Sequence, residues 1–319
     1  MQKINRRKIL SAAAGACAGY SLIGSRPAFA SPFPNRPINL IIPEAPGGTF
    51  DAYGREFSRL LQDRLKVNVE PINMPGAGGA EAIFSLFSDA ADGYTISLIG
   101  IPGGLMHNPR PDFNFNKLTW LANLSREPYG LAVGTNSLIK NFSDLLQLAS
   151  TRPVAFSIDG PGSTGSFLTK IFIAETNLRS KIVAGYQGSS AAVLAVARGE
   201  ADATVQSLTT IKKMQSASLA HLIFQFENVP APPGIESAKS IGKPELGEIF
   251  QWRSIVAPPG LPQNIAAGLS AALLDCANSS EAQQWAQKIH AELFPLGQAE
   301  TLKMVATQEA IVKKWRPLM

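Results

Sequence analysis

Short apolar segments alternate with amphipathic segments along most of the chain, and this alternation limits the possible folds more than any other sequence feature. Short, mostly apolar runs predict buried strands, whereas apolar residues at every third or fourth position predict helices. The first part of the chain contains a strand pattern at 38–42, a helix pattern at 57–65, a strand at 67–72, a helix at 83–87 and a strand at 94–99. This β-α-β-α-β order predicts an α/β unit.

The same alternation resumes further along the chain. It contains a strand pattern at 154–158, a helix at 167–172, a strand at 182–183, a helix at 193–197 and a strand at 203–208. Because segments that alternate in this way form a sheet covered by helices, the sequence predicts a second α/β unit. The predicted fold class is therefore α/β, with two α/β domains.

Two segments are predicted to connect these domains. Strands are expected at 118–124 and 129–133, and the Ser-Arg-Glu-Pro segment at 125–128 between them is predicted to be a loop at the first crossing. A second crossing is predicted near 252–257. The last 60 residues have helical spacing and no strand pattern, so we expect them to return as helices to the first sheet and leave a ligand cleft between the domains.

The first thirty residues have the pattern of an export signal. Four basic residues precede an Ala/Gly-rich stretch that is too short to span a bilayer, and an Ala-x-Ala tripeptide ends at Ala30. We therefore expect cleavage after Ala30 and a periplasmic mature protein. The adjacent Arg6 and Arg7 favour twin-arginine export, and Sec export stays open. A lipid anchor at Cys17 is the weaker alternative, because no large aliphatic residue stands at 14–16.

Removal of this signal changes the charge of the protein. The segment contains five of the 29 basic residues and none of the 24 acidic residues, so the mature chain has 24 of each. A neutral chain provides no electrostatic basis for binding nucleic acid or an anionic membrane. Cys276 is then the one remaining cysteine, and no intrachain disulfide is expected.

The mature chain has about 289 residues, a length at which a single hydrophobic core no longer grows and chains usually divide into domains. The length therefore also favours two domains. The predicted organisation is a signal peptide over 1–30, the first part of domain 1 over 31–125, domain 2 over 126–251, and the return of domain 1 with the C-terminal helices over 252–319.

Patterns typical of catalytic or metal sites are absent from the sequence. It contains no H-E-x-x-H, C-x-x-C or G-x-S-x-G pattern, and His107, His221 and His290 lie far apart. A periplasmic hydrolase is the alternative from another functional class, but the chain offers no set of nucleophile, base and orienting residue. We therefore predict a protein that is not an enzyme and that holds no metal.

Three glycine-rich loops each follow a predicted strand and open a predicted helix. They lie at 43–51, 73–79 and 159–166. A helix leaves its first N–H groups unpaired, and glycine lets an anion approach them, so converging helix starts predict a carboxylate site without Lys or Arg. Glycine and proline also serve simply to turn a loop, and that reading of any single loop stays open.

The third loop also matches the G-x-G-x-x-G fingerprint of dinucleotide binding, with a strand before it and a helix after it. That fingerprint requires an acidic residue near the end of the next strand, and 181–187 contains none. A nicotinamide cofactor is therefore not expected.

A series of segments in chain order carries a resemblance to a known family. The segments are Phe-Pro-Asn-Arg-Pro-Ile at 33–38, Ala-Pro-Gly-Gly at 45–48 with Asp51, Asn-Met-Pro-Gly-Ala-Gly-Gly at 73–79, Asp-Gly-Tyr-Thr at 92–95, Gly-Pro-Gly-Ser-Thr at 160–164, Tyr-Gln-Gly-Ser at 186–189, Gly-Glu-Ala-Asp at 199–202 and Ala-Pro-Pro-Gly-Leu-Pro at 257–262. Over essentially its whole mature length, the chain resembles the periplasmic solute receptors of tripartite tricarboxylate transporters, also called Bug-type receptors.

The resemblance implies a type II periplasmic binding fold, in which loop amides and ordered water hold a ligand carboxylate between the domains. It implies no cofactor, and it implies the membrane subunits of such a transporter as partners of a monomeric receptor. A receptor that reports its ligand to a membrane sensor is the alternative within this class. The loops and the resemblance together predict the ligand-binding residues Ala45, Gly47, Gly48, Asp51, Ala77, Gly78, Gly79, Gly162, Ser163, Thr164, Tyr186 and Gln206.

Three residues of the expected pocket depart from the family pattern. Glu44 stands where an aromatic residue is usual, Ser166 where His is common, and Gln206 where Asp commonly ends the pocket strand. A carboxyl at Glu44 would raise its own pKa or that of the ligand unless it points to solvent. Because Gln206 can donate as well as accept, a hydroxyl, amide or second carboxyl on the ligand suits it better than an ammonium. Asp51 has a second reading as a helix-start residue that bonds its own loop.

Overall fold

The computed structural model describes residues 33–106, 114–160 and 162–318. The signal peptide predicted for 1–30, with its cleavage site after Ala30 and with Cys17, lies outside these residues, as does His107. The chain from Pro34 onward forms one compact unit. None of the helices in the described segments is long and apolar enough to cross a membrane.

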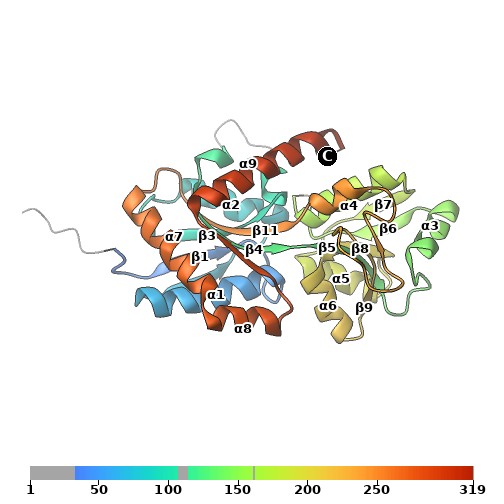
Figure 1. The fold of residues 1–319 in the computed structure, drawn as a ribbon, viewed down its shortest axis with the longest axis horizontal. Coiled ribbons are helices and arrows are strands. Elements are labelled where there is room, and N and C mark those ends of the chain that lie inside the picture. Colours follow the sequence, from blue (N-terminus) through green and yellow to red (C-terminus); the bar gives the residue numbers. More distant parts are fainter. Residues whose placement is uncertain (1–32, 107–113, 161, 319) are drawn as a thin grey trace, which may run out of the picture. The chain divides into compact units, whose positions relative to one another are not determined.

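The strands of the described residues form two six-stranded mixed sheets (Figure 1). In the first sheet, β1 lies between its parallel neighbours β2 and β3, while β11 is antiparallel to β3 and β4, and β12 is antiparallel to β4. The order is β12-β4-β11-β3-β1-β2, with β1 at Ile38–Ile42, β2 at Val69–Asn73, β3 at Thr95–Ile101, β4 at Thr119–Glu127, β11 at Gln251–Ala257 and β12 at Leu293–Leu296.

The second sheet has the order β10-β9-β5-β8-β6-β7. Here β6 is parallel to β7 and β8, and β5 is antiparallel to β8 and β9. The strands are β5 at Tyr129–Gly134, β6 at Val154–Ser157, β7 at Ser180–Val183, β8 at Ala203–Ser207, β9 at Ala220–Gln225 and β10 at Glu236–Ser237. The two sheets confirm the predicted α/β fold class.

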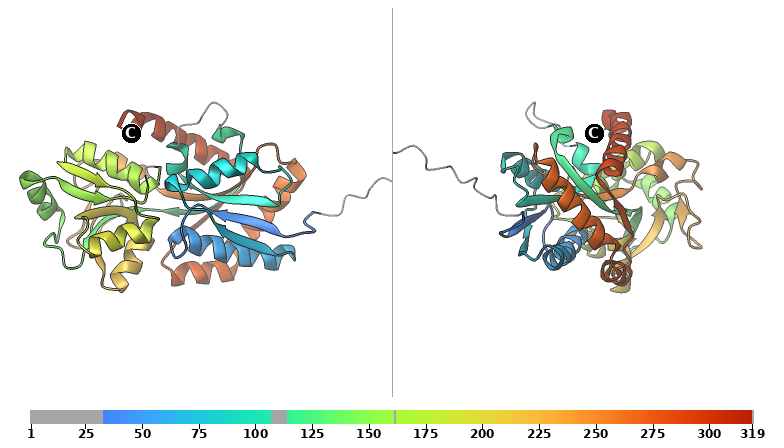
Figure 2. Two further views of the ribbon diagram at one scale, coloured as in Figure 1. Left: turned by 180° about the vertical axis from the view of Figure 1, so that it is seen from behind. Right: turned by 60° about the vertical axis from the view of Figure 1, so that its left-hand side comes forward.

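Helices cover both faces of each sheet (Figure 2). On the first sheet, α1 (Thr49–Leu65), α7 (Gln263–Asn278) and α8 (Ser280–Lys288) lie on one side, and α2 (Ala80–Ser88) and α9 (Gln298–Trp315) lie on the other. On the second, α5 (Ser189–Ala197) and α6 (Leu208–Ser216) lie opposite α3 (Phe142–Thr151) and α4 (Thr164–Thr176). This double cover explains why β1 is almost completely buried and reads as an apolar run.

Short 3-10 turns complete the described elements. They are η1 (Ala77–Gly79), η2 (Gly103–Met106), η3 (Phe115–Lys117), η4 (Pro244–Glu248) and η5 (Arg316–Leu318).

The segment predicted to be a loop at 125–128 is mostly strand. β4 runs to Glu127 and pairs with β11 along its length, so Pro128 is the one residue between β4 and β5. Polar residues at these positions look like a turn in the sequence. In the structure Ser125 and Glu127 are buried, and their polar groups have partners there. Proline ends the strand because it has no N–H for the ladder.

The prediction of no strand in the last 60 residues is also wrong. β12 (Leu293–Leu296) forms a short edge strand on β4, anchored by a hydrogen bond of 2.8 Å from Asn123 Nδ2 to Phe294 O. A four-residue strand that contains Pro295 is too short for a recognisable alternation, and proline in a sheet is confined to edges.

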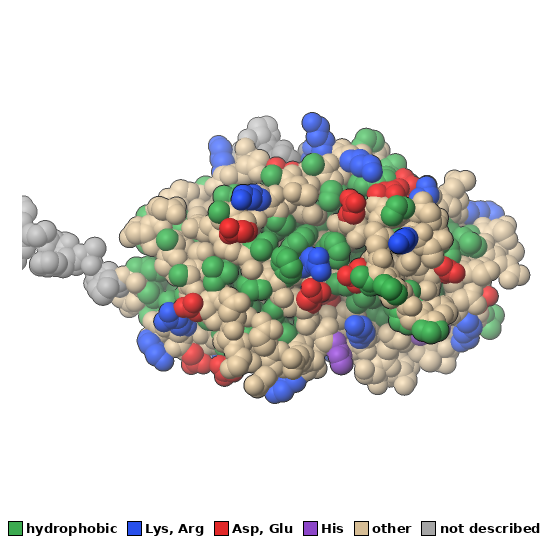
Figure 3. Space-filling view, in the orientation of Figure 1, with side chains coloured by type: hydrophobic (Ala, Val, Ile, Leu, Met, Phe, Trp, Pro, Cys, Tyr) green, Lys and Arg blue, Asp and Glu red, His purple; other side chains and the backbone are tan. Residues whose placement is uncertain are grey.

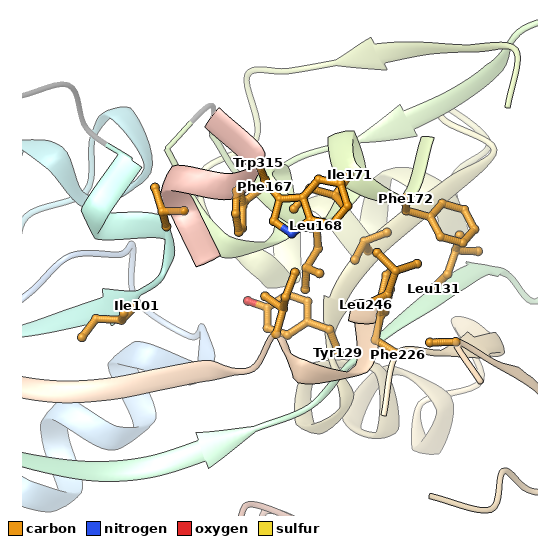
Figure 4. Packing of buried hydrophobic residues seen from close by; sticks show 14 of the residues in the cluster. Ile101, Tyr129, Leu131, Phe167, Leu168, Ile171, Phe172, Phe226, Leu246 and Trp315 are labelled. Carbon is orange, nitrogen blue, oxygen red and sulfur yellow. The ribbon is translucent and has the colours of Figure 1, made fainter. Parts of the chain in front are cut away.

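A large core cluster includes side chains from elements of both sheets. Figure 4 shows Trp315 of α9 beside Phe167 and Leu168 of α4, with Tyr129 of β5 close by and Ile101 of β3 at the left of the view. The C-terminal helix α9 therefore packs on the first sheet, while its last residue, Trp315, and the turn η5 that follows it contact α4 of the second sheet. On the surface face in Figure 3, acidic and basic side chains are mixed.

Candidate functional site

A cavity of about 210 Å³ lies where loops of the two sheets meet. The loops that follow β1, β2 and β3 form one wall, and those that follow β6 and β7 form the other. Ligands of open α/β sheets bind in this position, outside the carboxyl ends of the strands. Since a cavity of ~150 Å³ holds benzene, this one suits a solute with on the order of ten non-hydrogen atoms. The lining residues fall within 43–45, 75–79, 99–104, 159–164 and 185–188, with Phe50, Ile83 and Gln251.

Four helices of the described residues begin beside this cavity. α1 starts at Thr49, α2 at Ala80, α4 at Thr164 and α5 at Ser189, each just after a lining segment. The first N–H groups of a helix have no partner inside the helix and carry partial positive charge, so they attract an anion. The described lining residues include neither Lys nor Arg. Backbone amides are therefore the anion-binding groups that this wall offers.

The structure brings eight of the twelve predicted ligand-binding residues to the cavity wall. The described lining residues do not include the other four, Gly47, Gly48, Asp51 and Gln206. The eight that line the wall are Ala45, Ala77, Gly78, Gly79, Gly162, Ser163, Thr164 and Tyr186.

Asp51 organises the first loop from behind the wall. Its carboxylate accepts hydrogen bonds from Gly47 N and from Asn73 Nδ2, both at 2.9 Å, and it forms an ion pair with Arg55 at 2.9 Å. Burial alone would raise the pKa of Asp51, but these partners hold it below the ordinary value. This geometry supports the reading of Asp51 as a residue that bonds its own loop.

Gly47 and Gly48 also contact other parts of the protein instead of the cavity. Gly47 O faces helices of the second sheet and accepts from Lys213 Nζ at 3.3 Å and Ser190 Oγ at 3.4 Å. Gly48 leaves room for the side chain of Glu44, because a Cβ on Gly48 would lie only 2.6 Å from Glu44 Oε2. Gly47 therefore joins the first loop to helices of the second sheet, whereas Gly48 accommodates the side chain of Glu44.

Gln206 lies behind a carboxyl group that the sequence reasoning missed. Gln206 is fully buried at the end of β8, and its side chain hydrogen-bonds to that of Asp159, which lines the cavity. Ser163 Oγ also donates to Asp159 Oδ1. Burial raises the pKa of Asp159 despite these hydrogen bonds. Ser166 is likewise fully buried and does not line the cavity.

Glu44 places a second carboxyl group in the cavity wall. Part of the residue is exposed, but its Oε2 atom is buried and has no hydrogen-bond partner among the described residues. Burial, followed by the nearby charge of Asp159, raises the pKa of Glu44 to about 8. The side chain therefore does not escape to solvent, and its own pKa shifts as the sequence argument anticipated.

The glycine loops of the two sheets touch each other at the cavity. Gly103 N donates to Thr164 Oγ1 at 3.0 Å. A Cβ on Gly78 would lie 2.7 Å from Ser163 N, and one on Gly160 would lie 2.9 Å from Gly78 N. Glycine at these positions therefore lets the two backbones meet, which is a different role from leaving space for a ligand.

Arg253 lies behind the cavity floor and not in the wall. Its side chain is fully buried on β11, where the guanidinium pairs with Glu127 and lies 4.9 Å from the ring centre of Phe50 and 4.7 Å from that of Tyr53. Burial alone would lower the pKa of Arg253, but Glu127 raises it above the ordinary value. Glu127 Oε1 in turn accepts from Thr209 N of α6 at 2.8 Å. The ion pair therefore joins the first sheet to a helix of the second.

Tyr186 is the aromatic residue predicted for the pocket. It lines the cavity, and its hydroxyl donates to Glu200 Oε2 at 3.3 Å. Neither His221 nor His290 lines the cavity, and within the described segments no three His, Cys, Asp or Glu residues group as metal ligands would. The wall therefore offers amides, hydroxyls and the two carboxyls for binding.

Comparisons with known proteins assign this chain to a family. Residues 55–319 match the family described as Tripartite tricarboxylate transporter family receptor. The chain is also similar to protein BugT of Bordetella pertussis, with 28% identity over 228 residues that cover 69% of this chain and 70% of that protein.

Solved structures share the fold. The periplasmic binding protein BugD superposes with a TM-score of 0.79 at 18% identity, covering 89% of this chain and 98% of that one. The R. palustris protein Rpa4515 with adipate superposes with a TM-score of 0.81 at 22% identity, covering 90% and 98%. These superpositions confirm the predicted two-domain fold of periplasmic binding proteins.

Proposed function

This chain belongs to the tripartite tricarboxylate transporter receptor family, and we propose that it is a periplasmic receptor that captures a small carboxylate-bearing solute for a transporter of that type. The observation that carries the proposal is the set of four helix starts around a cavity whose described wall contains no basic side chain. Such a wall binds an anion through backbone amides. The solved relative with adipate supports a small acid of this size as the ligand.

The proposal includes export and delivery. The signal pattern at 1–30 supports removal of the leader after Ala30 and a freely diffusing mature protein. The family supports the membrane subunits of the transporter as partners. We propose that the chain connections at Pro128 and before Gln251 act as the hinge on which such a receptor closes, with domain boundaries near 125 and 251.

Binding of small acids to the purified mature protein tests this function. We expect the mass of a co-purified solute to correspond to a carboxylic acid, and at least one four- to six-carbon carboxylate to bind in titration calorimetry. Bound ligand should also raise the unfolding temperature by mass action. A co-purified solute without an acid group, together with no heat from any carboxylate, would show that the proposal is wrong.

Gly78→Ala is expected to weaken that binding at least tenfold. The added Cβ would lie 2.7 Å from Ser163 N, so the loops of the two sheets could not meet around the ligand. Calorimetry measures the affinity, and scattering should show a larger radius of gyration for the variant at saturation than for the unaltered protein.

Gly242→Ala is the matched control for this variant. Gly242 has φ +74, close to the φ +69 of Gly78, but a Cβ there has nothing within 4 Å. Both variants carry the strain of a left-handed alanine, about 1–2 kcal/mol, whereas Gly78→Ala also blocks the contact between the loops. Equal affinities for the two variants would refute the role of this contact.

A further inference from the structure

Two carboxyl groups face the same cavity from opposite sheets. Glu44 follows β1 in the first sheet and Asp159 follows β6 in the second, and both line the wall. The charges that act on Glu44 are those of Asp159, Glu127 and Asp51, which oppose its ionisation, and that of Arg253, which favours it. Since Arg253 is paired with Glu127, the two cavity carboxyls have no basic side chain of their own within the described wall.

The two carboxyls differ in how their oxygens are satisfied. Asp159 accepts from Ser163 Oγ and from the Gln206 side chain. Glu44 Oε2 is buried without a hydrogen-bond partner in the described residues, between a loop of the first sheet and Gly188 of the second. A Cβ on Gly188 would lie 3.5 Å from this oxygen, so the atom faces the far wall. Buried polar atoms normally have a hydrogen-bond partner, so the Glu44 oxygen requires a donor that the described residues do not supply.

Resting on the proposed function, we propose that the ligand is a small amino acid, with its carboxylate at the helix starts and its ammonium group at Glu44 and Asp159. An ammonium provides three donors and a positive charge, which together satisfy the unpaired Glu44 oxygen and allow Glu44 to ionise beside Asp159. Selection against ligands without the ammonium follows, because they would leave the Glu44 oxygen unpaired. The sequence disfavours an ammonium only if Gln206 lines the pocket. In the structure Gln206 lies behind Asp159, so this objection to an ammonium does not apply.

This binding mode moves a proton. Burial raises the pKa of Glu44 to about 8, so at pH 7 the empty site holds mostly the neutral acid. An ammonium beside it favours the carboxylate. Glu44 then loses its proton to the buffer, and an ion pair with the ligand forms. A dicarboxylate bound at the same position would keep Glu44 protonated and release nothing.

Titration calorimetry at pH 7 in buffers of different ionisation enthalpy tests the inference. The probes are succinate, glutarate and adipate, set against aspartate, glutamate, 4-aminobutanoate, 5-aminopentanoate and 6-aminohexanoate. We expect an amino acid of this panel to bind most tightly and to release up to about one proton. Glu44→Gln should weaken its binding roughly ten- to a hundredfold and abolish the proton release.

Glu70→Gln is the matched control, because Glu70 is an exposed residue of β2 that pairs with Asn68 away from the cavity. It should bind like the unaltered protein. Tighter binding of a dicarboxylate, or unchanged binding by Glu44→Gln, would overturn the inference and leave the proposed function standing. Binding of neither series would overturn both. Proton release is measured on the unaltered protein, so it tests whether ligand binding ionises Glu44 even if a variant does not fold.

Discussion

Replacing Arg253 with alanine is expected to destabilise the protein by about 3–5 kcal/mol, with or without ligand. The change leaves the Glu127 carboxylate buried without its partner, and it removes a guanidinium that packs against Phe50 and Tyr53. Chemical denaturation of the purified variant measures the loss. Because Arg253 does not line the cavity, weaker binding by this variant would not indicate a salt bridge to the ligand. It would reflect damage to the fold or the loss of a charge that favours ionisation of Glu44.

Two further variants sharpen this test. Arg64→Ala removes an ion pair of 2.6 Å with Asp275 that is exposed on both sides, and it should leave the unfolding midpoint nearly unchanged. Arg253→Met combined with Glu127→Gln should be less destabilising than Arg253→Ala alone, because no unpaired charge remains. If Arg253→Ala unfolds at the same denaturant concentration as the unaltered protein, the ion pair does not support the fold.

Between pH 5 and pH 8, the ligand-free protein is expected to lose stability that Glu44→Gln retains. The pKa of Glu44 rises from 4.5 to about 8 on folding. In this interval the folded state therefore holds a proton that the unfolded chain has released. The free energy of unfolding consequently falls as pH rises, by up to about 4 kcal/mol for this shift. The stabilising contribution is fully present below pH 4.5 and lost by about pH 8.

Denaturation curves collected across this pH range provide the comparison. Asp159 also has a raised pKa and contributes a fall of the same sign, but it remains in Glu44→Gln. Asp51 has a lowered pKa, so its contribution is lost only at acid pH, below the interval that is measured. Glu70→Gln should follow the unaltered protein. Parallel curves for the unaltered protein and Glu44→Gln would mean that Glu44 ionises normally in the fold.

Local periodicity was sufficient to predict much of the fold. The strand expected at 38–42 is β1, and the helix expected at 57–65 lies within α1. Such elements are predictable because each shows its buried face within its own residues. α3 and β9 were not predicted, and β12 was predicted to be absent. β12 shows why: a short edge strand exists only because β4 lies beside it.

The glycine loops of the site were also evident from sequence, because strand, turn and helix follow one another directly along the chain. The sequence by itself thus determined the α/β class, the family and the loops that hold the cavity. The burial and partners of each polar residue were decided by tertiary structure alone. Glu44 meets Asp159 from another sheet, Gln206 lies behind Asp159, and Arg253 is paired in the core. The burial of a residue and the charges near it depend on residues that are distant in the chain, so no local sequence pattern encodes them.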